Sequence, residues 1–206
     1  MRLRLKGSRF FVESFLLVIL LVIPQGTWAA VESPMSVIRS GSEKVLTILR
    51  QSERGQAPSL RQREGEVLQI VSKYFDFEQM SKMALGYPWK QQSPEKRQEF
   101  SDLFKKLLFN TYVDRMERYH NEKIVYDSQT INANLAVVKT HFLSNGENMA
   151  IDYRLRLEGQ QWKVYDVVVE GISYDDNYRA QISSILANNS FDTLLGMLRA
   201  KVGRDS

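Results

Sequence analysis

The apolar residues of this chain change their spacing twice, and this change constrains the fold more than any other feature. Between residues 34 and 119 they recur every three or four positions, which is the spacing of one face of a helix. Between 123 and 171 they alternate with polar residues as in strands, and between 174 and 202 the helical spacing returns. Helices followed by strands and then by helices predict an α+β fold rather than alternating βαβ units.

Signals for helix ends divide the two helical parts into shorter pieces. Asp76 is a typical N-cap residue, and Gly86 suits the left-handed conformation in which many helices end. Ser93 followed by Pro94 is a strong start for a long helix. The predicted helices cover 36–54, 60–75, the short stretch between Asp76 and Gly86, 94–119, 174–187 and 191–202.

Between the helical parts, short connections rich in Asn and Gly separate stretches with strand spacing. Connections of this length join antiparallel neighbours in hairpins. The third stretch alternates apolar and charged residues, so one face of the sheet is predicted to be dry and the other wet. The prediction is an antiparallel sheet packed against helices, with strands at 123–131, 135–144, 148–158 and 161–170.

Residues 1–29 have the layout of a secretory signal peptide. A basic stretch is followed by the apolar run 15–23 and by small residues at Thr27 and Ala29, which favour cleavage after Ala29. An uncleaved anchor is the alternative, but nine apolar residues fall well short of the roughly 20 that a spanning helix needs. Cleavage removes four basic residues and one acidic residue and lowers the net charge from +4 to +1. The sequence predicts an exported, nearly neutral protein whose single domain covers 30–206.

The composition argues against several kinds of site. The chain has no cysteine and two histidines, His120 and His141, so it offers no disulfide, no thiolate nucleophile and no ligand spacing typical of zinc. No glycine pair has the spacing of a nucleotide-binding loop. Most aromatic residues fall at core-facing positions, whereas a nucleic-acid-binding face needs them exposed. We therefore expect no metal, no cofactor and no nucleic acid.

One carboxylate, Asp166, allows two interpretations. It lies among apolar residues on the last predicted strand. Together with Tyr165 or His141 it could form a proton-transfer site, with Asp166 as the general base. Alternatively, it pairs with an arginine of a neighbouring strand and has a structural role, which is the preferred interpretation.

The apolar residues of the predicted helices and strands also allow two interpretations. They either fill an ordinary core or line a cavity between a helical layer and a sheet that do not close completely. Methionine favours the cavity, because its unbranched side chain adapts to ligands of variable shape. The candidate lining residues are Met80, Met83, Leu85, Phe104, Leu107, Leu108, Tyr112, Met116, Ile151, Tyr153, Leu155, Val164, Val167, Val169 and Ile172.

Two blocks of the sequence resemble one known family. The first block contains Phe75-Asp76-Phe77-Glu78-Gln79-Met80 and Ala84-Leu85-Gly86-Tyr87-Pro88-Trp89, and the second runs from Trp162 to Ser173. In this order they are similar to the MlaC family, also known as the toluene-tolerance family. The resemblance covers about 35–202, which is nearly the whole chain after the signal segment.

The resemblance implies a fold and a function. The fold is a curved sheet roll like that of nuclear transport factors, with helices and a deep apolar pocket for acyl chains. The implied function is to carry phospholipid as cargo through the periplasm, between an outer-membrane lipoprotein complex and an inner-membrane ABC transporter with a lipid-binding ring subunit. No catalytic residues come with it. Asp175 and Asp176 depart from the apolar or neutral residues expected there, which could alter headgroup preference or docking if they lie at the pocket mouth.

Three hypotheses about function follow. The preferred one is a periplasmic phospholipid carrier that maintains lipid asymmetry of the outer membrane and is not an enzyme. The second is a small enzyme of the same architecture in which Asp166→Asn abolishes activity. The third is an adaptor with a solid core and no ligand.

Overall fold

The computed structural model describes residues 31–53, 60–117, 123–144 and 146–204, all of which belong to one compact unit, Val31–Ser206. The predicted signal segment, residues 1–29, lies outside the described residues. The side chains of 51–53, 60–61, 112–117, 144 and 204 are likewise outside the description.

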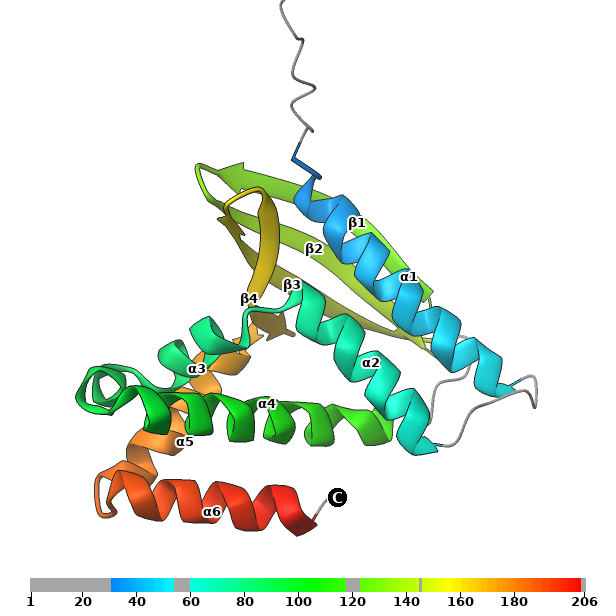
Figure 1. Ribbon diagram of the computed structural model, residues 1–206. Helices are drawn as coiled ribbons and strands as arrows, with labels where there is room; N and C mark the ends of the chain where they lie inside the picture. The colour runs from blue at the N-terminus through cyan, green and yellow to red at the C-terminus, as the bar shows by residue number, and fades with distance from the viewer. Residues whose placement is uncertain (1–30, 54–59, 118–122, 145, 205–206) are drawn as a thin grey trace, which may run out of the picture. The chain divides into compact units, whose positions relative to one another are not determined.

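The helices lie where the sequence predicted them, within a few residues at each end, except for a short 3-10 helix that it did not predict (Figure 1). The predicted caps are confirmed. The Asp76 carboxylate accepts a hydrogen bond from the Gln79 N–H at 2.9 Å, and Gly86 ends the short helix with a φ of 67°. The Ser93 hydroxyl accepts a bond from the Lys96 N–H at 3.3 Å. The helices are α1 (Pro34–Glu53), α2 (Leu60–Tyr74), α3 (Phe77–Leu85), the 3-10 helix η1 (Tyr87–Gln91), α4 (Pro94–Glu117), α5 (Tyr174–Leu186) and α6 (Phe191–Arg204).

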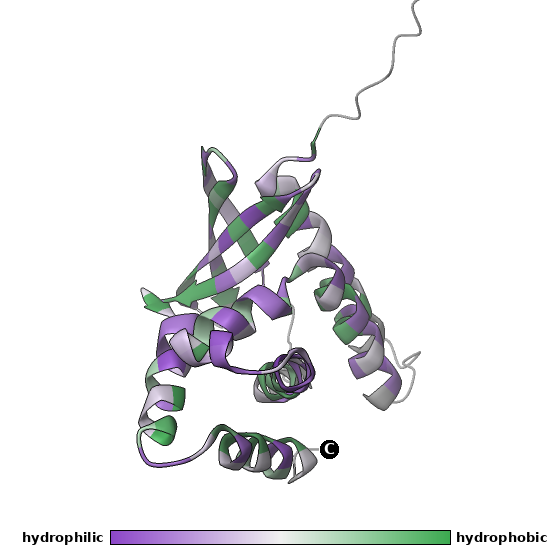
Figure 2. Cartoon of the chain, turned by 60° about the vertical axis from the view of Figure 1, so that its left-hand side comes forward, coloured by the Kyte–Doolittle hydropathy of each residue, from purple (hydrophilic) through white to green (hydrophobic). Residues whose placement is uncertain are grey.

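The strands form one antiparallel sheet in the order β1-β2-β3-β4-β5, so each strand pairs with the next one along the chain. The predicted meander is confirmed, but the sequence did not predict the fifth strand, which has two residues and no alternation to detect. A tight turn with φ of 49° at Glu170 and 80° at Gly171 folds it back onto β4. Figure 2 shows alternating hydrophobic and hydrophilic bands along the strands. The strands are β1 (Lys123–Asn132), β2 (Leu135–Ser144), β3 (Glu147–Glu158), β4 (Gln161–Val169) and β5 (Ile172–Ser173).

A β-bulge in β4 decides which of its side chains share a face. Two consecutive residues of β3 pair with Asp166 and Val164, so Tyr165 between them has no partner in the ladder. Successive residues of a regular strand alternate between faces, which would place Val164 and Val167 on opposite sides. The bulge puts both on one face, which we call the inner face.

Helix α1 covers part of the inner face. Val37 and Ile38 of α1 pack with buried strand residues in what we call the sheet cluster, and a smaller cluster joins Leu46 and Leu49 to Ile124 of β1. The sheet cluster consists of Val37, Ile38, Ala136, Val138, Leu155, Trp162 and Val164.

A second core, the helical cluster, holds α3, α4, α5 and α6 together. Phe100 and Phe104 of α4 are fully buried with their rings stacked 5.7 Å apart, and Tyr178 of α5 meets Phe104 edge-on at 5.1 Å. Such aromatic pairs add to the stability gained from buried area. The helical cluster consists of Met80, Ala84, Leu85, Trp89, Phe100, Phe104, Leu108, Ile182, Leu194, Leu195 and Leu198.

The link between α2 and α3 connects the two clusters. Phe75 packs against both of them and forms a parallel bridge with Val164. The Asp76 N–H donates to the Val164 carbonyl at 2.8 Å. The link therefore extends the sheet and attaches the helical part to β4.

Candidate functional site

The inner face of the sheet brings together the candidate lining residues of the strands. The register of β3 and β4 pairs them across the two strands, and the bulge keeps both sets on the same face. The cross-strand pairs are Ile151 with Val169, Tyr153 with Val167 and Leu155 with Val164.

Packing differs between the two ends of the inner face. At one end, Leu155 and Val164 are fully buried in the sheet cluster. At the other end, Ile151 and Val169 are only half-buried, and they belong to none of the clusters that the described residues form. This second end therefore offers apolar surface that these clusters do not fill.

Phe142 and Met149 enlarge this surface, and neither was among the residues predicted from the sequence. They pair across β2 and β3, and Met149 lies two residues from Ile151, on the same face. Both are half-buried, and neither joins a cluster of described residues. The alternation with Ile151 was the signal that could have identified Met149. We call Phe142, Met149, Ile151 and Val169 the apolar end of the sheet.

Tyr153 lies between the apolar end and the sheet cluster. It packs against the sheet cluster and remains only partly buried. Burial nevertheless raises the pKa of Tyr153 to about 12, with smaller contributions from Tyr126 and Tyr174. Tyr153 thus marks the boundary between the packed part of the inner face and the apolar end.

The helical candidates mostly belong to the helical cluster. Met80, Leu85, Phe104 and Leu108 are buried in it, and Leu107 packs against it. In these places they hold α3 and α4 against the neighbouring helices. The helical candidates in this cluster and the strand candidates in the sheet cluster thus belong to separate clusters, which meet at the α2–α3 link.

The remaining candidates either lie apart from both clusters or have side chains outside the part of the chain that the structure describes. Met83 is half-buried on α3, and its carbonyl accepts a hydrogen bond from Arg179 Nε at 2.8 Å. Ile172 is 62% exposed on β5, opposite Val169. The side chains of Tyr112 and Met116 lie outside the described residues.

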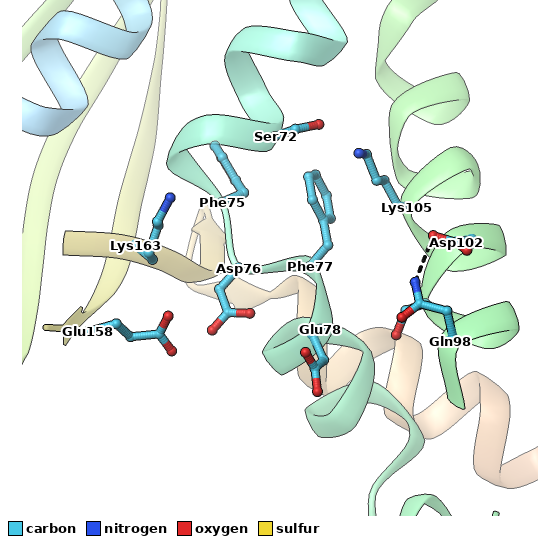
Figure 3. Close-up of a pocket in the computed structure, with 11 residues that line it drawn as sticks. Ser72, Phe75, Asp76, Phe77, Glu78, Gln98, Asp102, Lys105, Glu158 and Lys163 are labelled. Atoms are coloured by element: carbon cyan, nitrogen blue, oxygen red, sulfur yellow. Dashed lines mark hydrogen bonds between the residues drawn. The ribbon is translucent and has the colours of Figure 1, made fainter. Parts of the chain in front are cut away.

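A cavity of about 300 Å³ lies between the α2–α3 link, α4 and the β3–β4 hairpin (Figure 3). The stacked rings of Phe75 and Phe77, 5.9 Å apart, form its apolar part, and Lys105 lies 5.4 Å over the Phe77 ring. Its charged lining makes it unsuited to acyl chains, and its volume is at the small end for ligand pockets. The charged residues are Asp76, Glu78, Asp102, Lys105, Glu158 and Lys163.

Asp166 has the structural environment that the sequence analysis preferred. It is fully buried and accepts hydrogen bonds from Arg154 Nη1 at 2.8 Å, from Ser173 Oγ at 2.8 Å and from the Asp175 N–H at 3.2 Å. His141, its suggested partner, instead pairs with Asp127. A carboxylate with no accessible surface and these donors cannot reach a substrate, so the arrangement does not support a general base.

The two acidic residues at the start of α5 that depart from the family pattern have different environments, one in the core and one on the surface. Asp175 is 1% exposed, whereas Asp176 is exposed and its N–H donates to the cap Ser173. Asp175 therefore lies in the interior rather than at a rim where it would meet a headgroup.

The described residues hold no group of three or more His, Asp or Glu side chains placed to bind a metal ion. Within the same ranges, no helix has the length and apolar character that crossing a membrane requires.

Comparison with known proteins gives consistent results. The family model described as MlaC protein matches residues 39–200. The chain is 25% identical over 182 residues to toluene tolerance protein ttg2D of Pseudomonas putida, covering 86% of this chain and 83% of that protein. It is 26% identical over 200 residues to the intermembrane phospholipid transport system binding protein MlaC of Haemophilus influenzae, covering 90% and 89%.

A solved structure shares the fold. It is the phospholipid-binding protein from Ralstonia solanacearum in complex with a phospholipid, with a TM-score of 0.76 and 27% identity. The match covers 84% of this chain and 99% of the Ralstonia chain, so the α+β architecture with a curved, unclosed sheet is shared. The family match spans well over half of the sequence. The chain therefore belongs to the MlaC protein family.

Proposed function

We propose that this protein is a phospholipid carrier that encloses acyl chains against the inner face of its sheet. The observation that carries the proposal is the apolar end: Phe142, Met149, Ile151 and Val169 share one face and remain half-buried. Apolar side chains in such a place stabilise a hydrocarbon ligand by removing it from water.

A carrier needs an enclosed apolar site for an energetic reason. At about 0.8 kcal/mol per CH₂, two chains of roughly fourteen methylenes are disfavoured in water by about 20 kcal/mol. A phospholipid therefore crosses an aqueous compartment only when its chains are covered. The carrier itself needs no nucleotide site, because a partner complex can supply the energy for transfer.

The relatives support the same function. The Haemophilus relative is named as the binding protein of an intermembrane phospholipid transport system, and the Ralstonia chain was solved with a phospholipid. By this analogy the protein shuttles lipid through the periplasm and maintains outer-membrane asymmetry. Its partners are then an outer-membrane lipoprotein complex and an inner-membrane ABC transporter with a lipid-binding ring subunit. Export by residues 1–29, with cleavage after Ala29, belongs to the same proposal.

The proposed lining combines strand and helix residues. Ile151, Tyr153 and Val169 are its centre on the sheet, and Tyr112 and Met116 of α4 are predicted to contribute from the helical side. Leu155 and Val164 then stabilise the other end of the inner face rather than touching lipid, because the sheet cluster buries them completely.

Lipid analysis of the purified protein tests the proposal. The protein would be isolated from the periplasm of a Gram-negative host and examined by native mass spectrometry and organic extraction. We expect at least about one bound diacyl phospholipid per protein chain. Val169→Arg places a charge in the apolar end and should reduce bound lipid at least tenfold.

Val125→Arg is the matched control. Val125 is 42% exposed and pairs with His141 on the opposite face of the sheet, so the same substitution there should leave lipid binding unchanged. A wild-type protein without lipid that also takes none from vesicles would contradict the carrier and favour an adaptor. Equal losses in both variants would contradict the assignment of the site to the inner face.

A further inference from the structure

Asp175 is a buried carboxyl group to which no donor is directed. It is the second residue of α5 and 1% exposed. Its backbone N–H donates to Asp166, but neither of its own carboxyl oxygens has a hydrogen-bond partner among the described residues. An ionised carboxylate is strongly disfavoured in such a place. The group is therefore expected to be neutral in the folded protein.

Charges on the neighbouring elements act on this carboxyl group. Burial raises the pKa of Asp175 to about 8, and the Asp166 carboxylate on β4 is the second cause. Asp176 on α5 also raises it, while Arg179 on α5 and Arg154 on β3 lower it. Arg154 already holds Asp166 in a salt bridge, so the charge of Asp166 stays beside Asp175.

The other described elements packed against α5 present uncharged buried faces. Strand β5 contributes the buried Ser173 and the exposed, uncharged Ile172, and α4 meets α5 through Phe104 and Tyr178. The buried residues of the three helices are Met80, Ser81, Ala84 and Leu85 on α3, Phe100, Ser101, Phe104 and Leu108 on α4, and Leu194, Leu195, Leu198 and Val202 on α6. The protonation of Asp175 is therefore set by burial and by the four charged residues of β3, β4 and α5.

Helix α5 connects Asp175 to the proposed lipid site. The first turn of α5 lies against β4 through Asp166, and Ile182 further along belongs to the helical cluster. Strand β5 directly precedes α5 and pairs Ile172 with Val169 of the apolar end. A displacement of the first turn of α5 is therefore passed to Val169 through Ser173 and Ile172.

We propose that Asp175 is a proton-controlled latch between α5 and the sheet. With a neutral carboxyl group, the first turn of α5 stays packed on β4 beside Asp166. When Asp175 ionises, repulsion between two buried carboxylates loosens this packing, displaces β5 from the apolar end and speeds release of bound phospholipid. The release step rests on the proposed carrier function, whereas the loosening of α5 does not.

Thermal unfolding of the lipid-free full chain from about pH 5 to about pH 9 tests the latch. Burial raises the pKa of the Asp175 carboxyl to about 8, against 3.8 for an unperturbed carboxyl, so the wild type loses stability relative to Asp175→Asn as the pH rises to about 8. The Tm of Asp175→Asn should rise relative to that of the wild type by about 3 °C per pH unit up to about pH 8, and the difference should stay constant above that pH.

Asp176→Asn is the control, because this neighbour on α5 is exposed. Asp176 is only a minor cause of the raised pKa of Asp175, so Asp176→Asn should keep most of the pH-dependent loss of stability that the wild type shows. An Asp175→Asn curve parallel to that of the wild type would overturn the latch. The carbon-13 shift of the Asp175 carboxyl in the wild type is a second measurement that needs no folded variant. A midpoint near 8 supports the latch, and one near 4 overturns it.

Lipid transfer tests the release step separately. A fluorescent phospholipid would be followed from the loaded protein to phosphatidylcholine vesicles at about pH 6.5 and about pH 8.5. The wild type should transfer several-fold faster at the higher pH, and Asp175→Asn should show one rate. Equal wild-type rates would overturn the release step. A protein that binds no phospholipid at any pH contradicts the carrier function, while unfolding and the carboxyl shift still decide the latch.

Discussion

At the scale of single residues, the same chemical group has different roles because its neighbours differ. Asp166 and Asp175 are both buried, but donors surround only Asp166. Asp166 therefore stays in the core as a charged link between strands and α5, whereas Asp175 is expected to be neutral there.

Removing the Asp166 carboxylate should destabilise the protein strongly. Asp166→Ala leaves Arg154 and the Ser173 hydroxyl without their acceptor, which should cost about 3 kcal/mol in urea unfolding. Asp192→Ala is the control, because its salt bridge with Lys96 is exposed and should contribute less than about 1 kcal/mol. Similar losses in the two variants would contradict a structural role for Asp166.

Alanine substitutions should distinguish core from lining on one strand. Leu155→Ala removes a fully buried side chain from the sheet cluster and should cost about 3 kcal/mol in the lipid-free protein. Ile151→Ala, four residues away on the same face, should cost only about 1 kcal/mol because Ile151 is half-buried. The free energy of unfolding from urea titrations gives both values. An equal cost would mean that Ile151 is packed like the core.

At the scale of elements, the sequence predicted the helices and the antiparallel meander because their signals are local. Asp76, Gly86 and Ser93 mark helix ends through bonds within four residues, and hairpin connections fix which strands pair. The strand β5 was missed because two residues have no period. The bulge at Tyr165 was also missed, since it depends on pairing with β3 rather than on the residues of β4 alone.

Only part of the candidate site could be predicted from the sequence, because only some of its residues follow a local pattern. Alternation along β3 identified Ile151 and Tyr153, but Phe142 lies on β2 and could be assigned only once the register was known. The burial of Asp175 depends on how α5 packs against β4 and α3, which no local pattern encodes.

Gly86 shows how one element end depends on backbone conformation. Its φ of 67° and ψ of −137° are open essentially to glycine, while an added Cβ would come no nearer than 3.9 Å to Arg179 Nε. Gly86→Ala should therefore cost about 2 kcal/mol through backbone strain alone. Gly196→Ala, inside α6 with open space around it, should stabilise the protein by about 0.5–1 kcal/mol. Urea unfolding that gave both changes the same sign would contradict this explanation.

At the scale of the whole molecule, the described residues form two main cores that meet at the α2–α3 link. Phe75 packs against both, and the Asp76 N–H continues the contact to β4. This arrangement keeps the apolar end of the sheet apart from the tightly packed helical cluster. A carrier benefits from such a division, because the proposed lipid site can open while the helical cluster stays folded.

The division predicts how the protein unfolds when the link is weakened. Trp89 belongs to the helical cluster and Trp162 to the sheet cluster, so each reports on one core. In the chain after cleavage at Ala29, which lacks Trp28, versions that retain only Trp89 or only Trp162 should show coincident urea transitions when nothing else is changed. Phe75→Ala should lower stability by about 2 kcal/mol and separate the two transitions. Leu198→Ala, within the helical cluster, is the control and should lower stability without separating the two transitions. Coincident transitions in Phe75→Ala would show that contacts other than the α2–α3 link couple the two cores.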